Sequence, residues 1–581
     1  MNIICSKTEN LRFDINKDPI AINSYLYYCA LYGYNHLCEA IFKNLQSKPI
    51  LLKNSIGMDL YPLHVATKKR RTDVVELFLN YQADPNKKNH DGTTPLHIAC
   101  ENGYEDILLL LLCSKTISTD VTDNSRFTPL HKAALKGHTE IVALLLSFQS
   151  KPPIYENLPS NIYNKKGPNV NAADKDKNTP LHFASINGHT SIVSLLITHG
   201  ADINLINTSG YTPLHLASCK GHTSTIFVLL SLGKANINIP TRSFETYLMD
   251  SSSTPLHEAT RSGHTKIVSL LLSNGANINL RNQRGFTPLH EASKWGHRKI
   301  VSILLNHGIN INIKSDTGST ALHEASKNGH SSIVSILIDS SADANQEDND
   351  GCIPLHKASS KGHSEVALKL LPLSNINTKN KNGATPLYLA SKYGHRDIVS
   401  LLLSKSAQAN IANNLGLTAL HKAVQGGYKD IVSLLLSNSA KVNSVDSQER
   451  TPLFLACSFG HASIVALLLA KSANTEKATK HGMTVLHEAA YYGDIDIVRE
   501  LLVYKARVNV KDSTGKTALH HAITGNRLSV LKELIKYGAE VNAKDLDGNT
   551  PLDLARKLDN CEIIRFLEEY ENCSCCAFQS I

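Results

Sequence analysis

The sequence has few of the features that mark an enzyme or an integral membrane protein. Its 581 residues include one tryptophan and four methionines. No stretch matches a nucleophile elbow, a phosphate-binding loop or a kinase signature. No apolar run approaches the roughly 18 residues of a membrane-spanning helix, and Met1–Cys5 is too short an apolar stretch for a signal peptide. We therefore expect a non-enzymatic protein of the cytoplasm or the nucleus.

Net charge and the distribution of cysteines further limit the kinds of partner that the protein is expected to bind. The 60 basic and 51 acidic residues leave a net charge of +9, and the longest basic run is Lys68–Arg71. A nucleic-acid-binding protein usually carries a denser basic stripe. The 12 cysteines stand singly until the C-terminal end, without the paired spacing that predicts disulfides. Proteins are therefore the expected partners, and nucleic acid is not.

What the sequence does contain is a four-residue motif, Thr-Pro-Leu-His, at a nearly constant spacing of 33 residues. A fixed period of this size predicts one small unit stacked many times rather than a globular domain. The motif or a close variant opens units at Tyr61, Thr94, Thr128, Thr179, Thr212, Thr254, Thr287, Thr320, Ile353, Thr385, Thr418, Thr451, Thr484, Thr517 and Thr550.

The unit that begins near Phe286 illustrates the pattern. A short helix is predicted from Pro288 to about Lys294, because proline is tolerated at a helix start. A second helix with a wide apolar stripe is predicted from about Arg298 to Asn306, and Gly308 ends it. Such a helical hairpin buries its apolar faces only against stacked neighbours.

This unit resembles the ankyrin repeat, and the resemblance covers about residues 24–569, or about sixteen units with a degenerate first one at Ser24–Ala30. It implies an all-α repeat solenoid with short β-hairpin fingers, wound into a curved superhelix. Its fingers and first helices would line a concave surface that binds other proteins. It also implies that the motif histidines bridge neighbouring backbones by hydrogen bonds, and we expect no catalytic, metal or cofactor site among them.

The breaks in the pattern suggest the domain organisation. We expect a poorly ordered lead-in at residues 1–22, the solenoid at 23–570 with a capping repeat at 23–55, and a Cys-rich tail at 571–581. Insertions at about 151–168 and 240–250 are either tolerated loop growth or partner contacts. Leu371 and Pro372 predict a shortened second helix in the unit of Ile353.

We expect a protein–protein interaction scaffold or adaptor, and variable positions at the ends of first helices are its candidate contacts. Glu258, Glu291 and Glu324 share one register, and each stands three residues before a basic residue. These residues form either i,i+3 ion pairs on a solvated helix face or a charged ladder that partners recognise. Exposed aromatics beside basic residues suit an interface core. The candidate partner-binding residues are Arg261, Lys294, Trp295, Lys327, Lys392, Tyr393, Phe459, Tyr491 and Tyr492.

The C-terminal cysteines support the alternative function. Cys573, Cys575 and Cys576 are candidates for S-acylation, which would make the chain a membrane or cytoskeletal anchor. With Cys561 they could also hold zinc, although their spacing fits no standard site. The third interpretation is that the tail is inert.

Overall fold

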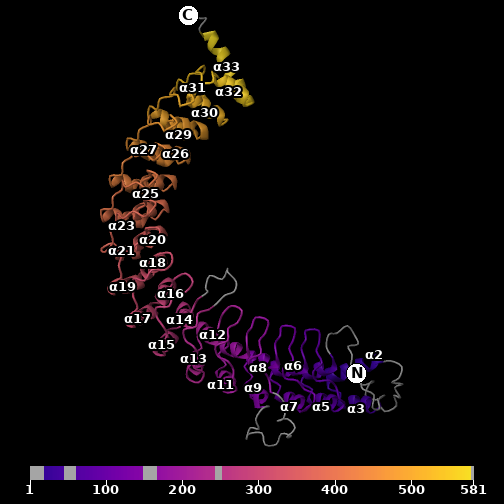
Figure 1. Ribbon diagram of the computed structural model, residues 1–581. Coiled ribbons are helices and arrows are strands. Elements are labelled where there is room, and N and C mark those ends of the chain that lie inside the picture. The colour runs from indigo at the N-terminus through magenta and orange to yellow at the C-terminus, as the bar shows by residue number, and fades with distance from the viewer. Residues whose placement is uncertain (1–18, 45–60, 148–166, 242–251, 578–581) are drawn as a thin grey trace. The chain divides into compact units, whose positions relative to one another are not determined.

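The computed structural model describes residues 19–44, 61–147, 167–241 and 252–577, and these fold into helices α2 to α33 (Figure 1). The helices belong to two compact units, Met1–Glu291 (unit 1) and Ala292–Ile581 (unit 2). Most of the two predicted insertions and the end of the predicted capping repeat lie outside the described residues. Helix α2 begins at Pro19, before the predicted start of the solenoid, and α33 continues to Ala577, into the predicted tail.

Unit 1 consists of alternating first and second helices, and each first helix packs on the next first helix. The first helices are α2 (Pro19–Tyr32), α4 (Pro62–Lys68), α6 (Pro95–Asn102), α8 (Pro129–Lys136), α10 (Pro180–Ile186), α12 (Pro213–Lys220) and α14 (Pro255–Arg261). The second helices are α3 (Asn35–Asn44), α5 (Thr72–Asn80), α7 (Glu105–Cys113), α9 (Thr139–Leu146), α11 (Thr190–Thr198), α13 (Thr223–Ser231) and α15 (Thr265–Ser273). Helix α16 (Pro288–Trp295) spans the boundary between the units.

Unit 2 repeats this arrangement. Its further first helices are α18 (Ala321–Lys327), α20 (Pro354–Lys361), α22 (Pro386–Lys392), α24 (Ala419–Gln425), α26 (Pro452–Ser458), α28 (Val485–Tyr492), α30 (Ala518–Thr524) and α32 (Pro551–Lys557). Its second helices are α17 (Arg298–Asn306), α19 (Ser331–Asp339), α21 (Ser364–Leu370), α23 (Arg396–Ser404), α25 (Lys429–Ser437), α27 (Ala462–Ala470), α29 (Ile495–Val503), α31 (Leu528–Lys536) and α33 (Cys561–Ala577).

Local sequence sets where these helices begin and end. In α6, Thr94 is the N-cap, its hydroxyl accepts a hydrogen bond from the His97 amide, and Pro95 occupies the first helical position. The predicted bounds of α17 are confirmed, and its Ile300, Val301 and Leu304 are buried. The predicted shortening before Pro372 is confirmed as well, because α21 ends at Leu370.

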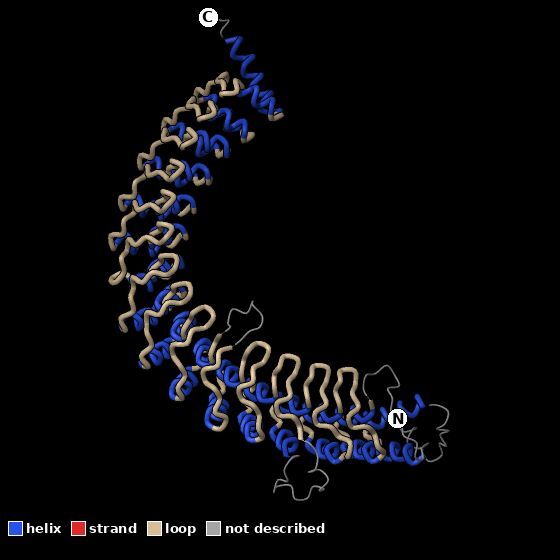
Figure 2. Tube along the Cα trace, viewed as in Figure 1, coloured by secondary structure: helices blue, strands red, loops and turns tan. Residues whose placement is uncertain are grey.

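The expected β-hairpin fingers are not strands in any described residue, and this part of the prediction is wrong. Each finger closes with very few backbone hydrogen bonds. At its base, the Asn89 amide donates to the Thr93 carbonyl at 2.9 Å, whereas the Thr93 amide donates to the Asn89 side chain at 2.7 Å. The side chain thus replaces a ladder bond. Neighbouring fingers share one backbone–backbone bond, such as Asn124 N–H to the Asp91 carbonyl at 2.9 Å. In unit 1 the fingers stand on the side of the first helices (Figure 2).

Small residues allow first helices to pack closely. Ala325 in α18 is fully buried, and the next position along the helix is usually small as well. Several units carry a buried serine or threonine there whose hydroxyl has no hydrogen-bond partner, namely Ser185, Ser218, Thr260, Ser293, Ser326, Ser359 and Ser391. An unpaired buried hydroxyl costs about 1–3 kcal/mol, so this column of hydroxyls lowers the stability of the stack.

Replacing Ala325 by Asp should place an unpaired charge between first helices and cost about 3–5 kcal/mol locally. Because each repeat contacts only its neighbours, amide hydrogen exchange should accelerate in α18 and α20 and stay unchanged in α30. Ser326→Ala is the matched control, and we expect protection equal to or greater than that of the wild type. Unchanged protection of α20 in the Asp variant would contradict the nearest-neighbour picture.

Candidate functional site

The motif histidines act as two-sided connectors. In His323, Nδ1 accepts from the Thr320 amide at 3.2 Å, while Nε2 donates to the Cys352 carbonyl of the next repeat at 2.8 Å. An amide only donates and a carbonyl only accepts, so these partners fix the neutral tautomer with its proton on Nε2. The same pair of bonds is made by His97, His131, His182, His215, His257, His356, His421, His487 and His520.

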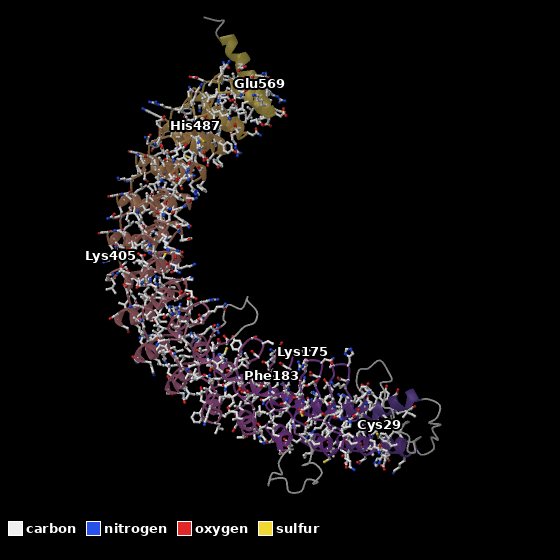
Figure 3. The ribbon with its side chains drawn as sticks, viewed as in Figure 1. Cys29, Lys175, Phe183, Lys405, His487 and Glu569 are labelled. Atoms are coloured by element: carbon white, nitrogen blue, oxygen red, sulfur yellow. The ribbon has the colours of Figure 1, made fainter. Side chains whose placement is uncertain are left out.

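Burial keeps these rings neutral. Removal from water lowers the pKa of His323 to about 4, although the bond to the Cys352 carbonyl opposes this shift. The pKa values of His97, His215 and His421 are also lowered to about 4, for the same reason. His487 lies in this position among the helices of unit 2 (Figure 3). The histidines are therefore occupied by structural bonds and are poorly placed for acid–base chemistry.

The last repeat carries Asp553 where most of the others carry histidine. Its carboxylate accepts from the Thr550 amide at 3.0 Å and from the Thr550 hydroxyl at 2.7 Å. These bonds lower the pKa of Asp553. Asp553 therefore performs the intra-repeat half of the histidine's task.

A second set of histidines joins the turns of adjacent repeats. His330 Nε2 donates to the Lys294 carbonyl at the end of the preceding first helix, at 3.0 Å. Its ring lies against Gly296, where a Cβ would come within 2.8 Å of the His330 Cε1 atom. Gly296 also has a φ of +83°, so both space and backbone conformation favour glycine there. These contacts fix the ends of the first helices.

Charged residues near the start of the first helices fasten the fingers to the helices. Lys357 lies 2.5 Å from Asp348 at the finger base, and His521 lies 2.8 Å from Asp512. Burial would raise the pKa of Asp348, but the bond from Lys357 helps to hold it below its usual range. These pairs are structural, since both partners in each belong to one repeat.

The three glutamates predicted to lie on a solvated face are instead buried. Asn282 Nδ2 donates to Glu291 at 3.1 Å, and Ser319 Oγ donates to Glu324 at 2.8 Å. The carboxylates turn toward the finger base because the first helix packs there, which spacing along the helix does not show. Arg261 in unit 1 lies 2.5 Å from Glu258 and is itself largely covered, so this candidate residue is engaged within its own helix.

The remaining aromatic candidates lie at the C-terminal ends of first helices in unit 2. Trp295, Tyr393, Phe459 and Tyr492 occupy the same position, the eighth residue after the motif threonine, and Tyr491 precedes Tyr492. Their exposed fractions run from 41% to 51%. Large side chains that are half exposed at one register are available for contact with a partner.

Lysines accompany two of these rings. The Lys294 ammonium lies 5.1 Å from the Trp295 ring centroid, and that of Lys392 lies 5.0 Å from the Tyr393 ring, both within cation–π distance. Lys327 is exposed at the same register as Lys294. The structure thus brings Lys294 to Trp295 and Lys392 to Tyr393, and places the two pairs in different repeats.

An exposed tyrosine cluster at the C-terminal end of α2 and in the turn after it was missed by sequence reasoning. The rings of Tyr28 and Tyr32 stack with centroids 6.3 Å apart, and those of Tyr32 and Tyr34 with centroids 5.8 Å apart. The i,i+4 spacing of Tyr28 and Tyr32 was a usable signal. The degenerate motif of this repeat hid the fact that Tyr32 shares the register of Trp295.

The acylation hypothesis lies beyond the side chains that the structure describes. Cys573, Cys575 and Cys576 fall within α33, but only side chains up to Glu571 in that helix are described. Across the described ranges, His, Cys, Asp and Glu side chains form no group of three or more that could hold a metal ion. Within the same ranges, no helix has the length and apolar character to cross a membrane.

Comparison with known families resolves the fold. The profile described as "Ankyrin repeats (3 copies)" matches residues 26–123, 63–155, 155–241, 243–315, 311–380, 367–446, 439–512 and 486–577. The chain belongs to the ankyrin-repeat family. The predicted resemblance is therefore confirmed, and the ankyrin repeats extend over nearly the whole chain.

This ankyrin-repeat protein is similar to parts of proteins with different activities. It is 33% identical over 135 residues to a probable serine/threonine-protein kinase of Dictyostelium discoideum, covering 22% of this chain and 14% of the kinase. It is 39% identical over 94 residues to a transient receptor potential cation channel subfamily A member 1 homolog of Caenorhabditis elegans, covering 16% and 7%. It is 28% identical over 180 residues to human NF-kappa-B inhibitor alpha, covering 31% and 42%. The matches span less than half of each relative, so their activities are not carried over to this ankyrin-repeat protein.

The buried histidines predict an acid-sensitive ankyrin array. Their native pKa is depressed below the ordinary value of about 6.5, so between pH 6.5 and about 4 the unfolded chain binds more protons. The stability they contribute is present above pH 6.5 and is lost as the pH falls toward 4. His323→Phe should remove about one proton from those taken up on unfolding at pH 5.

Proton uptake is measurable by calorimetry in buffers of different ionisation enthalpy. Phenylalanine is a reasonable replacement because Phe454 holds this position in another repeat, with its amide donating to the Thr451 hydroxyl at 3.2 Å. At neutral pH the variant should be less stable, since the bonds to Thr320 and Cys352 are lost. Equal proton uptake by wild type and variant would show that His323 is not neutral in the native protein.

Proposed function

We propose that this ankyrin-repeat protein is a non-enzymatic interaction scaffold or adaptor that binds one or more protein partners. The observation that carries the proposal is the set of half-exposed aromatic side chains at one register of unit 2. Burial of such rings is a common source of affinity in protein interfaces. The motif residues are already occupied within the array, whereas the variable residues at the helix ends are exposed to a partner.

The names of two relatives support the adaptor form of the proposal. Human protein phosphatase 1 regulatory subunit 27 is 37% identical over 74 residues, covering 13% of this chain and 48% of that protein. NF-kappa-B inhibitor alpha is likewise named for its effect on another protein. By analogy, the chain would hold a client, or bring one to an enzyme encoded elsewhere, without catalysing a reaction itself.

The fine assignment concerns the helix ends of unit 2. Trp295 and Tyr393 are the proposed anchors, with Lys294, Lys327 and Lys392 as surrounding charges. Phe459, Tyr491 and Tyr492 extend the aromatic surface, and the Tyr491 and Tyr492 rings meet edge to face at 5.3 Å. Truncation of an aromatic anchor to alanine costs about 2 kcal/mol or more of binding free energy, whereas peripheral charges mainly affect the association rate.

The test begins with affinity capture and mass spectrometry, followed by titration of the captured partner. Trp295→Ala and Tyr393→Ala should each weaken binding about 30-fold or more. Lys294→Ala should change affinity less and alter its dependence on salt. Tyr504→Ala is a matched control, because Tyr504 is an exposed aromatic directly after a second helix. Equal affinity of wild type, Trp295→Ala and Tyr393→Ala would remove this surface from consideration.

A further inference from the structure

The exposed ends of the first helices in unit 2 change chemistry part-way along the row. We define the helix-end row as the seventh and eighth residues after each motif position. For the repeats of Thr287 to Thr517, it comprises residues 294/295, 327/328, 360/361, 392/393, 425/426, 458/459, 491/492 and 524/525. The turn histidines hold several of these ends in register, as His330 does for Lys294 and His363 for Lys327.

The first four repeats of the row are basic. Their eight residues are Lys-Trp, Lys-Asn, Ser-Lys and Lys-Tyr, so each repeat contributes one lysine and none contributes an acidic residue. The adjoining starts of the second helices strengthen this charge with Arg298, Lys299 and Arg396. Two acidic side chains stand among them, Asp397 at 3.8 Å from Arg396 and Glu365 at 3.7 Å from Lys369. This basic half is therefore a surface of net positive charge with two aromatic anchors.

The next four repeats of the row carry no charge. Their residues are Gln-Gly, Ser-Phe, Tyr-Tyr and Thr-Gly, and the exposed rings of Phe459, Tyr491 and Tyr492 dominate them. The neighbouring charges do not restore a positive surface, because Lys429 and Arg527 are outnumbered by Asp430, Asp494 and Asp496. This aromatic half presents apolar rings and no row of cations.

We infer that the row binds one extended polypeptide segment with an acidic block over the basic half and an apolar block over the aromatic half. This inference rests on the proposed function and adds the chemistry of the partner. Negative side chains complement the lysines in charge, and apolar side chains bury the rings. A partner of uniform charge would match only one half of the row.

Spacing favours an extended chain. Adjacent helices lie roughly 8–10 Å apart. A chain extended in the polyproline II conformation rises about 3.1 Å per residue with three residues per turn, so one repeat corresponds to about three residues and every third side chain faces the row. A helix rises only about 1.5 Å per residue and would need about six residues per repeat. From Trp295 to Tyr492 the extended segment would contain about 15 to 19 residues. A nucleic acid fits less well, because the aromatic half has no net positive charge to neutralise its phosphates.

The test uses the full chain and three fluorescent peptides of about 18 residues, a length set by the same spacing. One has glutamate at every third position of one half and leucine or phenylalanine at every third position of the other. The second replaces glutamate by lysine, and the third replaces the apolar residues by serine. Fluorescence anisotropy should show at least tenfold tighter binding of the first peptide than of either other peptide.

Charge reversal locates the acidic block. Lys327→Glu combined with Lys361→Glu should weaken binding of the acidic–apolar peptide at least tenfold. The matched control is Lys405→Glu with Lys471→Glu, which reverses two lysines directly after second helices of the same unit. Figure 3 labels Lys405 on the second-helix side of unit 2. The control should leave affinity within about twofold, since those lysines lie off the row.

A photoreactive benzophenone in the apolar block locates the other half. Mass spectrometry should find the label near Phe459 and Tyr492 and not near Trp295. Equal affinity of the glutamate and lysine peptides, or labelling spread over both halves, would overturn the inference. So would equal competition by a single-stranded oligonucleotide of similar length. If these peptide tests fail but Trp295→Ala still weakens binding of the captured partner, the proposed binding surface is supported and only the inferred chemistry of the partner is wrong.

Discussion

The array depends on one interaction, the neutral histidine that completes a helix cap in its own repeat and donates to a carbonyl of the next. The ring performs both tasks because it carries one hydrogen-bond acceptor and one donor, both in the plane of the ring. Burial between first helices disfavours the charged form and thereby protects the tautomer that the bonds require. Where Tyr388 and Phe454 replace the histidine, the threonine hydroxyl still caps the helix. The Tyr388 hydroxyl accepts a bond from Asn413 Nδ2 of the next repeat at 3.1 Å, whereas Phe454 has no polar atom for such a bond.

Much of the fold could be predicted because the unit repeats many times, and repetition separates signal from chance. The bounds of α17 and the end of α21 before Pro372 follow from local chemistry alone. The burial of Glu258, Glu291 and Glu324 could not be predicted, because it depends on where the finger returns across the helix. The absence of strands among the described fingers has a similar cause, since side chains such as that of Asn89 take over ladder bonds.

Among the candidate site residues, the sequence identified residue types better than it identified neighbours. Aromatic residues before the turn glycine are visible by inspection, and half exposure follows from their place at a helix end. The cover over Arg261 is not visible, because it arises from a buried carboxylate. The change from a basic to an uncharged row is present in the sequence, but it becomes meaningful only when these positions are known to share one exposed register.

Asp553 has a consequence for how an array of this kind can change in length. A repeat with a motif histidine reaches forward to the carbonyl of a successor, so identical units can be inserted or deleted between two others without altering the bonding scheme. A unit added after Asp553 would present its carbonyl to a carboxylate that has no proton to offer at neutral pH. The array can therefore grow by internal duplication with this bond intact, whereas a unit added after Asp553 would be joined without it, as the unit after Phe454 is.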